Sequence, residues 1–526
     1  MMTKLIYLIA ILSLTTNVFS QSIESIDWGA YQDMPEETSY QQSIGYDDDA
    51  YYLIRSDHKV GLNRDKVWLE GVSSLTNTLE SSSEILLPSV GGVQTQYETM
   101  FYKANKFILF TVAKNKTANK KILYVSYLKP DGSLKNKPKE IASVPASNLD
   151  KDGFNIFLSD DEKNIVIESH KTFKKYNGDK LNMIVIDFNL AEVFNSDIVL
   201  NEKFNKKEII VLQQSYNKGK YIFLAKTEEL SARKSSKTTQ YAFNVFVYNT
   251  AKKSMHNFKV TMPKFKVDDA RYTIDNDGNI VVGGFVKGRS VKFINEKQGM
   301  FFKRYNPKTL KEIPDLDLKS FYMKFPREFI TKINKEQYGE TPSIRYAYSV
   351  NSVEALANGG YVILAEQKWV DGRVVTKAGG GQETGIQYYH HNNIMAGGIS
   401  KKGKFTWINL YPKIQNTTND HGYYSSYKVV KIQNKLKLFY NCNEKNLHTG
   451  ELTKIKEFNN NVRTNPKGMA GVLSIYWDGS YERDPMFRGK DNKVILIPQT
   501  LAPNSVQYGI GVTNGKQVKF GSFSLE

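Results

Sequence analysis

The feature that most constrains the fold is a β-rich unit that recurs along the chain. Each unit begins with a turn signal and continues as a run of β-forming residues. The eight runs are centred on Tyr52, Phe107, Val166, Tyr221, Val281, Val362, Leu436 and Val494. These centres are 55, 59, 55, 60, 81, 74 and 58 residues apart, which is near the upper end of blade lengths in β-propellers. The two wide gaps predict insertions.

A second β-rich run follows each centre and has the pattern of a hairpin. Glycine-containing turn pairs stand in the middle of several runs: Asp131-Gly132, Lys402-Gly403, Asp478-Gly479 and Asn514-Gly515. Such pairs favour tight hairpin turns because these turns need positive φ. The copy in the first unit, Val67–Leu79, is only weakly marked. Each unit therefore predicts about four strands.

A single four-stranded sheet cannot bury both of its faces, whereas sheets stacked around an axis bury each other. The predicted fold class is therefore all-β: a β-propeller with seven or eight four-stranded blades, forming one domain over residues 21–526. We expect the N-terminal region to pair with the final strand, Val518–Phe523, and so close the ring. The alternative, β-sandwiches in series, needs Pro-, Gly- or Ser-rich linkers, and the sequence has none.

Three insertions interrupt the repeat, at residues 316–346, 368–392 and 443–467. In the first, Pro326 can start a helix, and Phe325, Phe329, Ile330 and Ile333 recur at helical spacing. One short inserted helix is predicted near Pro326–Ile333. The second contains Gly379–Gly381 and is expected to form a loop, and the third is polar and Asn-rich, which is also typical of a loop.

The N-terminal residues have the pattern of an export signal. Lys4 precedes a ten-residue apolar run, Leu5–Leu14, and Val18-Phe19-Ser20 offers a cleavage site. We expect residues 1–20 to be a signal peptide of a bacterial protein that is exported to the periplasm or the extracellular space. The apolar run is too short to span a bilayer, and no other stretch approaches the required length, so no transmembrane segment is predicted.

Charge and cysteine content exclude some function classes. The net charge is +18, but lysine-rich clusters such as Lys114–Lys121 lie beside separate turn signals, which indicates solvated turns rather than a specific nucleic-acid surface. Cys442 is the only cysteine, so an intramolecular disulfide is impossible. We interpret Cys442 as a buried core residue.

Two short motifs resemble ligand sites. Asp275-Asn276-Asp277-Gly278-Asn279 has oxygen ligands at alternate positions, but Val286 stands where a calcium loop needs glutamate, so we interpret it as a turn. Gly403-Lys404-Phe405-Thr406-Trp407 resembles part of the tryptophan-docking repeat of quinoprotein dehydrogenases. The preceding Asp and Thr of that repeat are absent, so we interpret Trp407 as a packing residue.

Aromatic and histidine residues gather around the second insertion. We predict a ligand-binding site at Trp369, Tyr388, Tyr389, His390, His391, His421 and Tyr423. Aromatic residues with polar neighbours between strands suit stacking on a sugar or contact with a peptide. On a strand, His390 and His391 point to opposite sides and cannot bind one metal together. A hairpin tip packed by its own aromatics is the alternative.

The segment Gly359–Gln415 resembles a segment of secreted bacterial β-propeller-like repeat proteins. The matching residues are Gly360–Gln367, the aromatic run before Asn393, Gly403–Trp407 and Pro412–Gln415. The resemblance implies export and a repeat fold, and implies no activity.

These features together predict a binding or scaffold protein that engages a glycan or protein of the cell envelope. The alternative is an envelope enzyme acting on glycans. No catalytic residue, metal site or cofactor is predicted, since no nucleophile elbow, zinc motif or phosphate loop is present. We expect a monomer.

Overall fold

The structure is a computed structural model of the 526-residue chain. It describes residues 26–36, 38–57, 66–115, 117–145, 153–171, 180–199, 209–229, 240–288, 297–314, 322–330, 348–375, 384–448, 454–459, 468–486, 495–503, 507–513 and 516–524. The predicted signal peptide, Ile333, Gly379–Gly381, Val494 and the Asn514-Gly515 turn lie outside these residues.

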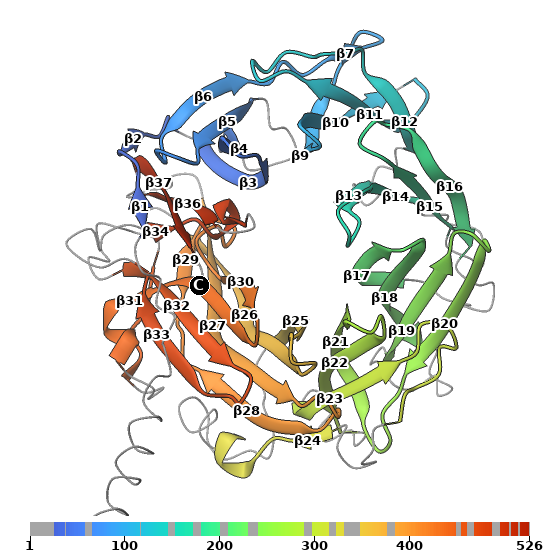
Figure 1. Cartoon of the computed structure of the whole chain (residues 1–526), viewed down its shortest axis with the longest axis vertical. Coiled ribbons are helices and arrows are strands. Elements are labelled where there is room, and N and C mark those ends of the chain that lie inside the picture. The colour runs from blue at the N-terminus through green and yellow to red at the C-terminus, as the bar shows by residue number, and fades with distance from the viewer. Residues whose placement is uncertain are drawn as a thin grey trace, which may run out of the picture.

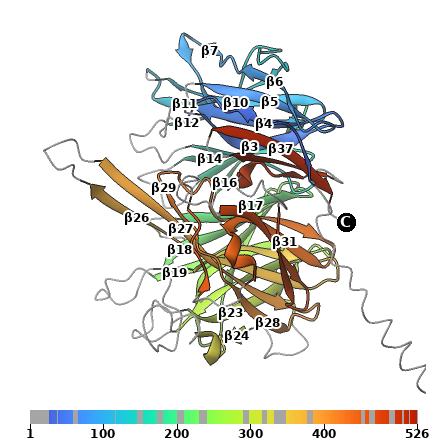
Figure 2. The same ribbon diagram turned by 90° about the vertical axis from the view of Figure 1, so that its left-hand side faces the viewer.

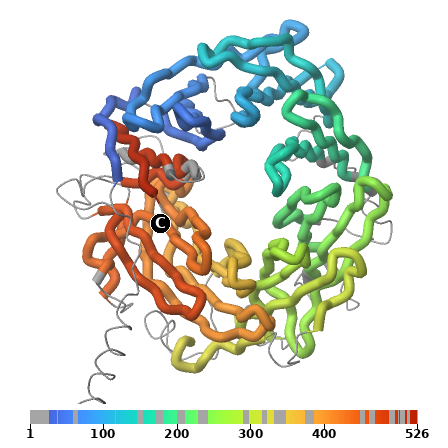
Figure 3. The backbone as a smooth tube through the Cα atoms, viewed as in Figure 1, coloured from blue at the N-terminus to red at the C-terminus, as the bar shows by residue number. Residues whose placement is uncertain are grey.

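Eight antiparallel sheets stand around a central axis and form a β-propeller (Figures 1 and 3). Seven of them are built from consecutive strands, with the first strand nearest the axis in Figure 1 and the fourth on the outside. The predicted fold class is confirmed, and the number of blades is eight. Each predicted centre that the structure describes falls in the second strand of a blade, so the recurring unit is one blade.

The first four blades follow the chain in order. The first contains β3 (Thr38–Tyr46), β4 (Ala50–Asp57), β5 (Val67–Ser73) and β6 (Leu79–Glu84). The second contains β9 (Gln96–Lys103), β10 (Lys106–Asn115), β11 (Lys120–Leu128) and β12 (Lys139–Pro145), preceded by the small hairpin of β7 (Ser89–Val90) and β8 (Val93–Gln94). The third contains β13 (Phe154–Leu158), β14 (Ile165–Lys171), β15 (Lys180–Ile186) and β16 (Glu192–Val199). The fourth contains β17 (Ile209–Asn217), β18 (Lys220–Glu229), β19 (Gln240–Asn249) and β20 (Ser254–Val260).

The remaining blades include the two longest strands. The fifth contains β21 (Lys266–Ile274), β22 (Ile280–Lys287), β23 (Lys297–Tyr305) and β24 (Tyr322–Lys324). The sixth contains β25 (Tyr348–Ala355), β26 (Tyr361–Val375), β27 (Thr384–Ile399), β28 (Phe405–Tyr411) and β29 (Asn416–Thr418). The seventh contains β30 (Tyr427–Ile432), β31 (Lys435–Asn443), β32 (Gly468–Tyr476) and β33 (Tyr481–Pro485). The eighth contains β34 (Ile495–Leu496), β35 (Ala502–Pro503), β36 (Gln507–Thr513), β37 (Gln517–Ser524), β1 (Asp27–Trp28) and β2 (Gln32–Asp33).

The hydrophobic core is divided between the blades. Eight clusters of buried apolar side chains lie in the described part of the chain, and each joins two adjacent blades. One of them joins Tyr40 and Leu53 of the first blade to Phe520 of the eighth. Every blade is thus packed on both faces, which explains why β22 is apolar from Ile280 to Val286 and buried at each of these positions.

The two ends of the described chain close the ring in the eighth blade. Asp27 pairs with Ser522 and Gln32 pairs with Val518, so the N-terminal strands β1 and β2 lie along β37 as predicted. The side chain of Asn77, in the first blade, donates to the carbonyl of Asp27 at 2.7 Å and to the Ser522 hydroxyl at 3.0 Å. Asn77 therefore fixes the closing strands to the next blade.

The Asp275–Asn279 motif is a turn, as predicted. One carboxylate oxygen of Asp275 accepts from the backbone N–H groups of Asp277 and Asn279, at 3.0 and 2.7 Å. The other accepts from the Tyr361 hydroxyl of the sixth blade at 3.0 Å. Asp47 makes the same kind of contact with Tyr102 of the second blade, at 2.6 Å. These aspartates join neighbouring blades.

The structure refines the expectations for the first unit and for the first and third insertions, and it contradicts the expectation for residues 368–392. The weakly marked hairpin of the first unit is formed by β5 and β6, whose pairing shifts register between Gly71 and Val72. The short helix predicted near Pro326–Ile333 is described at residues 327–330, where the N–H of Ile330 donates to Pro326 O at 3.1 Å, and strand β24, just before it, completes the fifth blade. Residues 368–392, expected to form a loop, are largely paired strand. The third insertion includes a 3-10 helix, η2 (Glu444–His448).

Candidate functional site

A two-stranded arm projects from the sixth blade. In its inner part, from Tyr361 to Glu366, β26 pairs with both β25 and β27; Gln367 pairs with β25 alone, where the pairing with β27 shifts register. Beyond Gln367, β26 pairs with β27 alone, as far as the Val375–Thr384 pair. Figure 2 shows these strands extending beyond one side of the ring. The short strand β29 pairs with β27 at Tyr388–His390 and supports the base of the arm.

One face of the arm carries an aromatic stack. Trp369 and His390 are cross-strand partners, and their rings are parallel within 9°, with centroids 4.4 Å apart. The Asp371 carboxylate accepts a hydrogen bond from Trp369 Nε1 at 3.0 Å and lies 3.2 Å from His390 Nε2. His390 Nδ1 donates to Asn416 Oδ1 at 2.7 Å. Two hydrogen bonds, one to each ring, therefore hold the two rings in one orientation.

The opposite face carries a second group of predicted residues. The Tyr389 hydroxyl donates to Gln387 Oε1 and lies 3.0 Å from His421 Nδ1. His391 also lies on this face, next to Gly422. The alternation of the strand explains the division, because Tyr388 and His390 share one face while Tyr389 and His391 share the other. The predicted separation of His390 and His391 is thus confirmed.

A buried ionic network lies under the base of the arm. Glu366 is fully buried at the end of the inner part of β26. Its Oε1 lies 2.6 Å from Lys413 Nζ, and its Oε2 accepts from His391 Nδ1 at 3.1 Å and from the Ser426 hydroxyl at 2.8 Å. Lys413 also donates to Gln415 Oε1 at 2.7 Å. Four elements of the chain therefore meet at one carboxylate.

The network shifts the pKa values of both its charged members. Burial alone would raise the pKa of Glu366, but the Lys413 ammonium and the hydrogen bond from His391 outweigh it and lower the pKa to about 2. Burial lowers the pKa of Lys413, and the neighbouring carboxylate opposes this change. Glu366 is thus ionised over the whole range of ordinary pH and holds the arm through charge-assisted hydrogen bonds.

The structure brings six of the seven predicted residues to the arm and its base. Trp369, Tyr388 and His390 share one face, and Tyr389, His391 and His421 gather on the other. Tyr423 lies apart from them, because it packs against the core between the first and eighth blades.

Four residues of the site were not predicted as site residues from the sequence: Asp371, Asn416, Glu366 and Lys413. For Glu366, one feature of the sequence could have indicated a buried ionic contact: it is a carboxylate within the otherwise largely apolar run Tyr361–Gln367.

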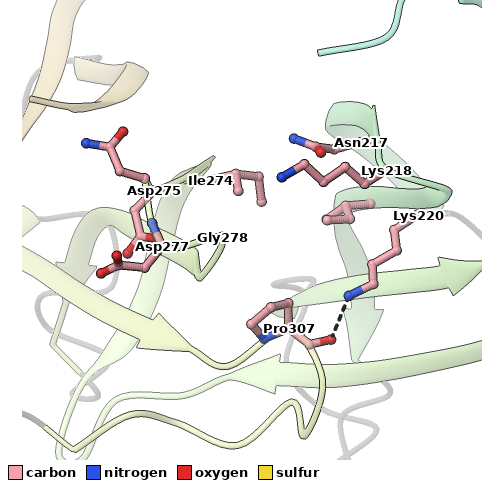
Figure 4. Close-up of a pocket in the computed structure, with 10 residues that line it drawn as sticks. Asn217, Lys218, Lys220, Ile274, Asp275, Asp277, Gly278 and Pro307 are labelled. Atoms are coloured by element: carbon pink, nitrogen blue, oxygen red, sulfur yellow. Dashed lines mark hydrogen bonds between the residues drawn. The ribbon is translucent and has the colours of Figure 1, made fainter. Parts of the chain in front are cut away.

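A separate pocket of about 260 Å³ lies between the fourth and fifth blades. Figure 4 shows Lys218 extending toward the turn that carries Asp275 and Asp277, while Lys220 reaches the carbonyl of Pro307. These turns join first to second strands, whereas the arm joins a second to a third strand. The pocket therefore opens on the opposite side of the ring from the arm.

Within the described residues, no group of three or more His, Cys, Asp or Glu side chains is arranged to hold a metal ion. No described helix has the length and apolar character needed to cross a membrane.

No protein-family model matches the chain, and no curated protein matches it in sequence. Among solved structures it is similar to the WD40 domain of SCAP from fission yeast, with 9% identity over 96% of this chain and 97% of that one, and a TM-score of 0.36. It is also similar to a polysaccharide lyase of family PL25, an ulvan lyase, with 8% identity, 87% and 96% coverage, and a TM-score of 0.37. The α-L-arabinanase of Penicillium chrysogenum matches with 10% identity, 65% and 92% coverage, and a TM-score of 0.33. At these values the likenesses carry no argument about binding or catalysis.

Proposed function

We propose that this protein is an exported binding or scaffold propeller, periplasmic or extracellular, that holds a protein partner through its arm. The observation that carries the proposal is the Trp369–His390 stack on a two-stranded extension of the sixth blade. Asp371 and Asn416 fix both rings before any partner arrives, so little side-chain freedom is lost on binding. Large aromatic side chains that are already ordered are typical centres of binding energy at protein interfaces.

The shape of the arm favours a protein over a glycan. Sites for small ligands are usually concave and enclose most of the ligand. The arm instead projects beyond the side of the ring and exposes Val370, which is 58% accessible, between Trp369 and Asp371. A projecting surface of this kind fits a concave partner surface.

A capture experiment with cell-envelope extract tests the proposal. The immobilised wild-type protein is compared with a Trp369→Ala/Tyr388→Ala double variant, using quantitative mass spectrometry, and each enriched protein is then purified and its affinity measured directly. Trp477→Ala is a matched control, because this tryptophan is 59% exposed and lies in the seventh blade, away from the arm. We expect a purified partner to bind wild type and the control, and to bind the double variant at least tenfold more weakly.

Two results would overturn the proposal. Equal affinity of wild type and the double variant for every purified partner would remove the arm as the binding site. Arm-dependent binding on a glycan array, without any arm-dependent protein, would assign the site to a glycan instead.

A further inference from the structure

Among the described residues, the outer edge of β26 has no partner strand beyond Gln367. The ladder between β25 and β26 begins at the Tyr348–Gln367 pair, and residues 368–375 pair with β27 on their other side. No strand in the described part of the chain pairs with this outer edge. An unpaired edge presents backbone donors and acceptors that favour the addition of another strand.

Two hydrogen bonds show which residues of β26 face the free edge. The N–H of His391 bonds Gln415 O at 2.9 Å, and the N–H of Gln387 bonds Asn419 Oδ1 at 2.8 Å. Both groups therefore point away from β26, so the pairs Lys368–His391 and Gly372–Gln387 are non-hydrogen-bonded pairs. By alternation, the backbone N–H and C=O groups of Lys368, Val370 and Gly372 point outward.

The sequence of this edge is complementary to a second copy of itself in antiparallel pairing. Residues Val370-Asp371-Gly372-Arg373-Val374 have valine at both ends and opposite charges on either side of the glycine. In an antiparallel pair of two copies centred on Gly372, Val370 stands opposite Val374, and Asp371 stands opposite Arg373. The acidic and basic positions fall at non-hydrogen-bonded pairs, where cross-strand neighbours are closest.

Gly372 gives an independent indication of an approaching backbone. A Cβ atom at this position would meet nothing within 4 Å, and the residue has no positive φ. The arm itself therefore does not require glycine here, although glycine weakens a strand interior. In strands, such a glycine often marks the close approach of another backbone.

We propose that two copies of this chain associate by antiparallel pairing of their β26 edges, with Gly372 on the two-fold axis. With Gly372 on the axis, residues 369–375 of each copy pair with each other. These residues do not include the part of β26 that is already paired with β25. Each copy offers the same edge, which gives a closed two-fold dimer.

The dimer uses the edge of the arm and the proposed function uses its faces, but Asp371 takes part in both, because its carboxylate also accepts from Trp369 Nε1. Val370→Pro leaves that contact in place, and Trp369→Ala leaves the outward backbone groups in place, so these two variants let the proposals fail separately. A single short strand pair is a small interface, and we expect a monomer in dilute solution and a dimer at high concentration.

Sedimentation equilibrium of the full chain, from about 1 to about 200 µM, tests this pairing. Wild type is expected to dimerise as concentration rises. Asp371→Arg and Arg373→Glu each place like charges opposite one another, so each variant alone is expected to dimerise at least tenfold more weakly. The equimolar mixture is expected to recover dimers, because one variant is then basic at both positions and the other acidic. Recovery also shows that both variants keep a folded arm.

Val370→Pro provides a second test. Proline removes one outward N–H group but leaves the pairing with β27 intact, and edge strands tolerate proline. This variant is expected to remain monomeric over the whole concentration range. Any of three results would overturn the proposal. Wild type could remain monomeric at every concentration, Val370→Pro could be a dimer at every concentration, or the mixture of the two charge variants could be no more dimeric than each variant alone. Slow hydrogen exchange at Val370 and Gly372 in dilute wild type would also overturn it, since the edge would then be covered within one chain.

Discussion

The ammonium of Lys413 lies 2.6 Å from a carboxylate oxygen of Glu366, and both side chains are only 1% exposed. The partners are 47 residues apart in sequence; Glu366 belongs to the strand that enters the arm, and Lys413 lies between β28 and β29. A buried pair of this kind is costly to break, because removal of one member leaves the other charge without compensation. We infer that this pair fixes the base of the arm.

Glu366→Gln is therefore expected to destabilise the fold by about 3–5 kcal/mol, measured as the free energy of unfolding in urea. A matched control is Glu162→Gln, which breaks an ion pair with Lys103 at the surface, where the Glu162 side chain is 61% exposed. This control should change the free energy of unfolding by less than about 1 kcal/mol. The double variant Glu366→Leu/Lys413→Met removes both charges and is expected to recover much of the loss. A Glu366→Gln variant as stable as the control would contradict this role.

The same carboxylate predicts a dependence of stability on pH. Its folded pKa of about 2 lies below its ordinary value of 4.5, so its contribution is fully present above about pH 4.5. The contribution, about 3 kcal/mol, is lost as the pH falls from about 4.5 toward 2. Unfolding free energies of wild type and Glu366→Gln, measured from pH 7 to pH 3, should converge in the acid range. A constant difference between the two proteins would show that Glu366 does not titrate in this way.

The repeat could be read from sequence because seven of the eight recurring runs contain the second strand of a blade. The eighth run contains β34, which lies at the edge of its sheet, and the sequence left the count open between seven and eight blades. Tyr52 lies in β4 and Phe107 in β10, both buried between sheets, so the local pattern of apolar residues reflects the global repeat. The fifth blade was harder to predict. Tyr322–Lys324 completes its sheet after a long connection, and the nearby Pro326 with Phe325 and Phe329 gave a stronger local signal for helix.

The site was predictable in composition but not in arrangement. A histidine pair, Trp369 and nearby tyrosines marked the region, because aromatic clusters are conspicuous in sequence. The Trp369–His390 stack depends on the strand register between β26 and β27, and a single sequence does not contain that register. Lys413 could not be assigned to Glu366 because the contact is long-range.

The ring closure gives a prediction at Gly29. This residue follows β1 and donates its N–H to Phe520 O at 3.0 Å, and a Cβ atom here would lie 1.8 Å from the carbonyl oxygen of Asn77. Gly29→Ala must therefore displace the closing strand, with an expected loss of about 1–3 kcal/mol and faster hydrogen exchange along β37. Gly153→Ala is the control, since a Cβ atom there meets nothing within 4 Å. Equal exchange in both variants would show that the closing strand contributes little.

Substitutions at and around Trp407 can separate a packing role of this residue from a role in ligand binding. Its indole N–H donates to the carbonyl of Trp477 in the seventh blade at 2.9 Å, and its ring lies against Gly398 and Gly479. Trp407→Phe loses the hydrogen bond and should cost about 1 kcal/mol. Gly398→Ala should cost more, about 1–3 kcal/mol, because a Cβ atom there would lie 2.1 Å from the indole. Neither change should alter binding through the arm. Weaker partner binding by Trp407→Phe at unchanged stability would instead place Trp407 in a ligand site.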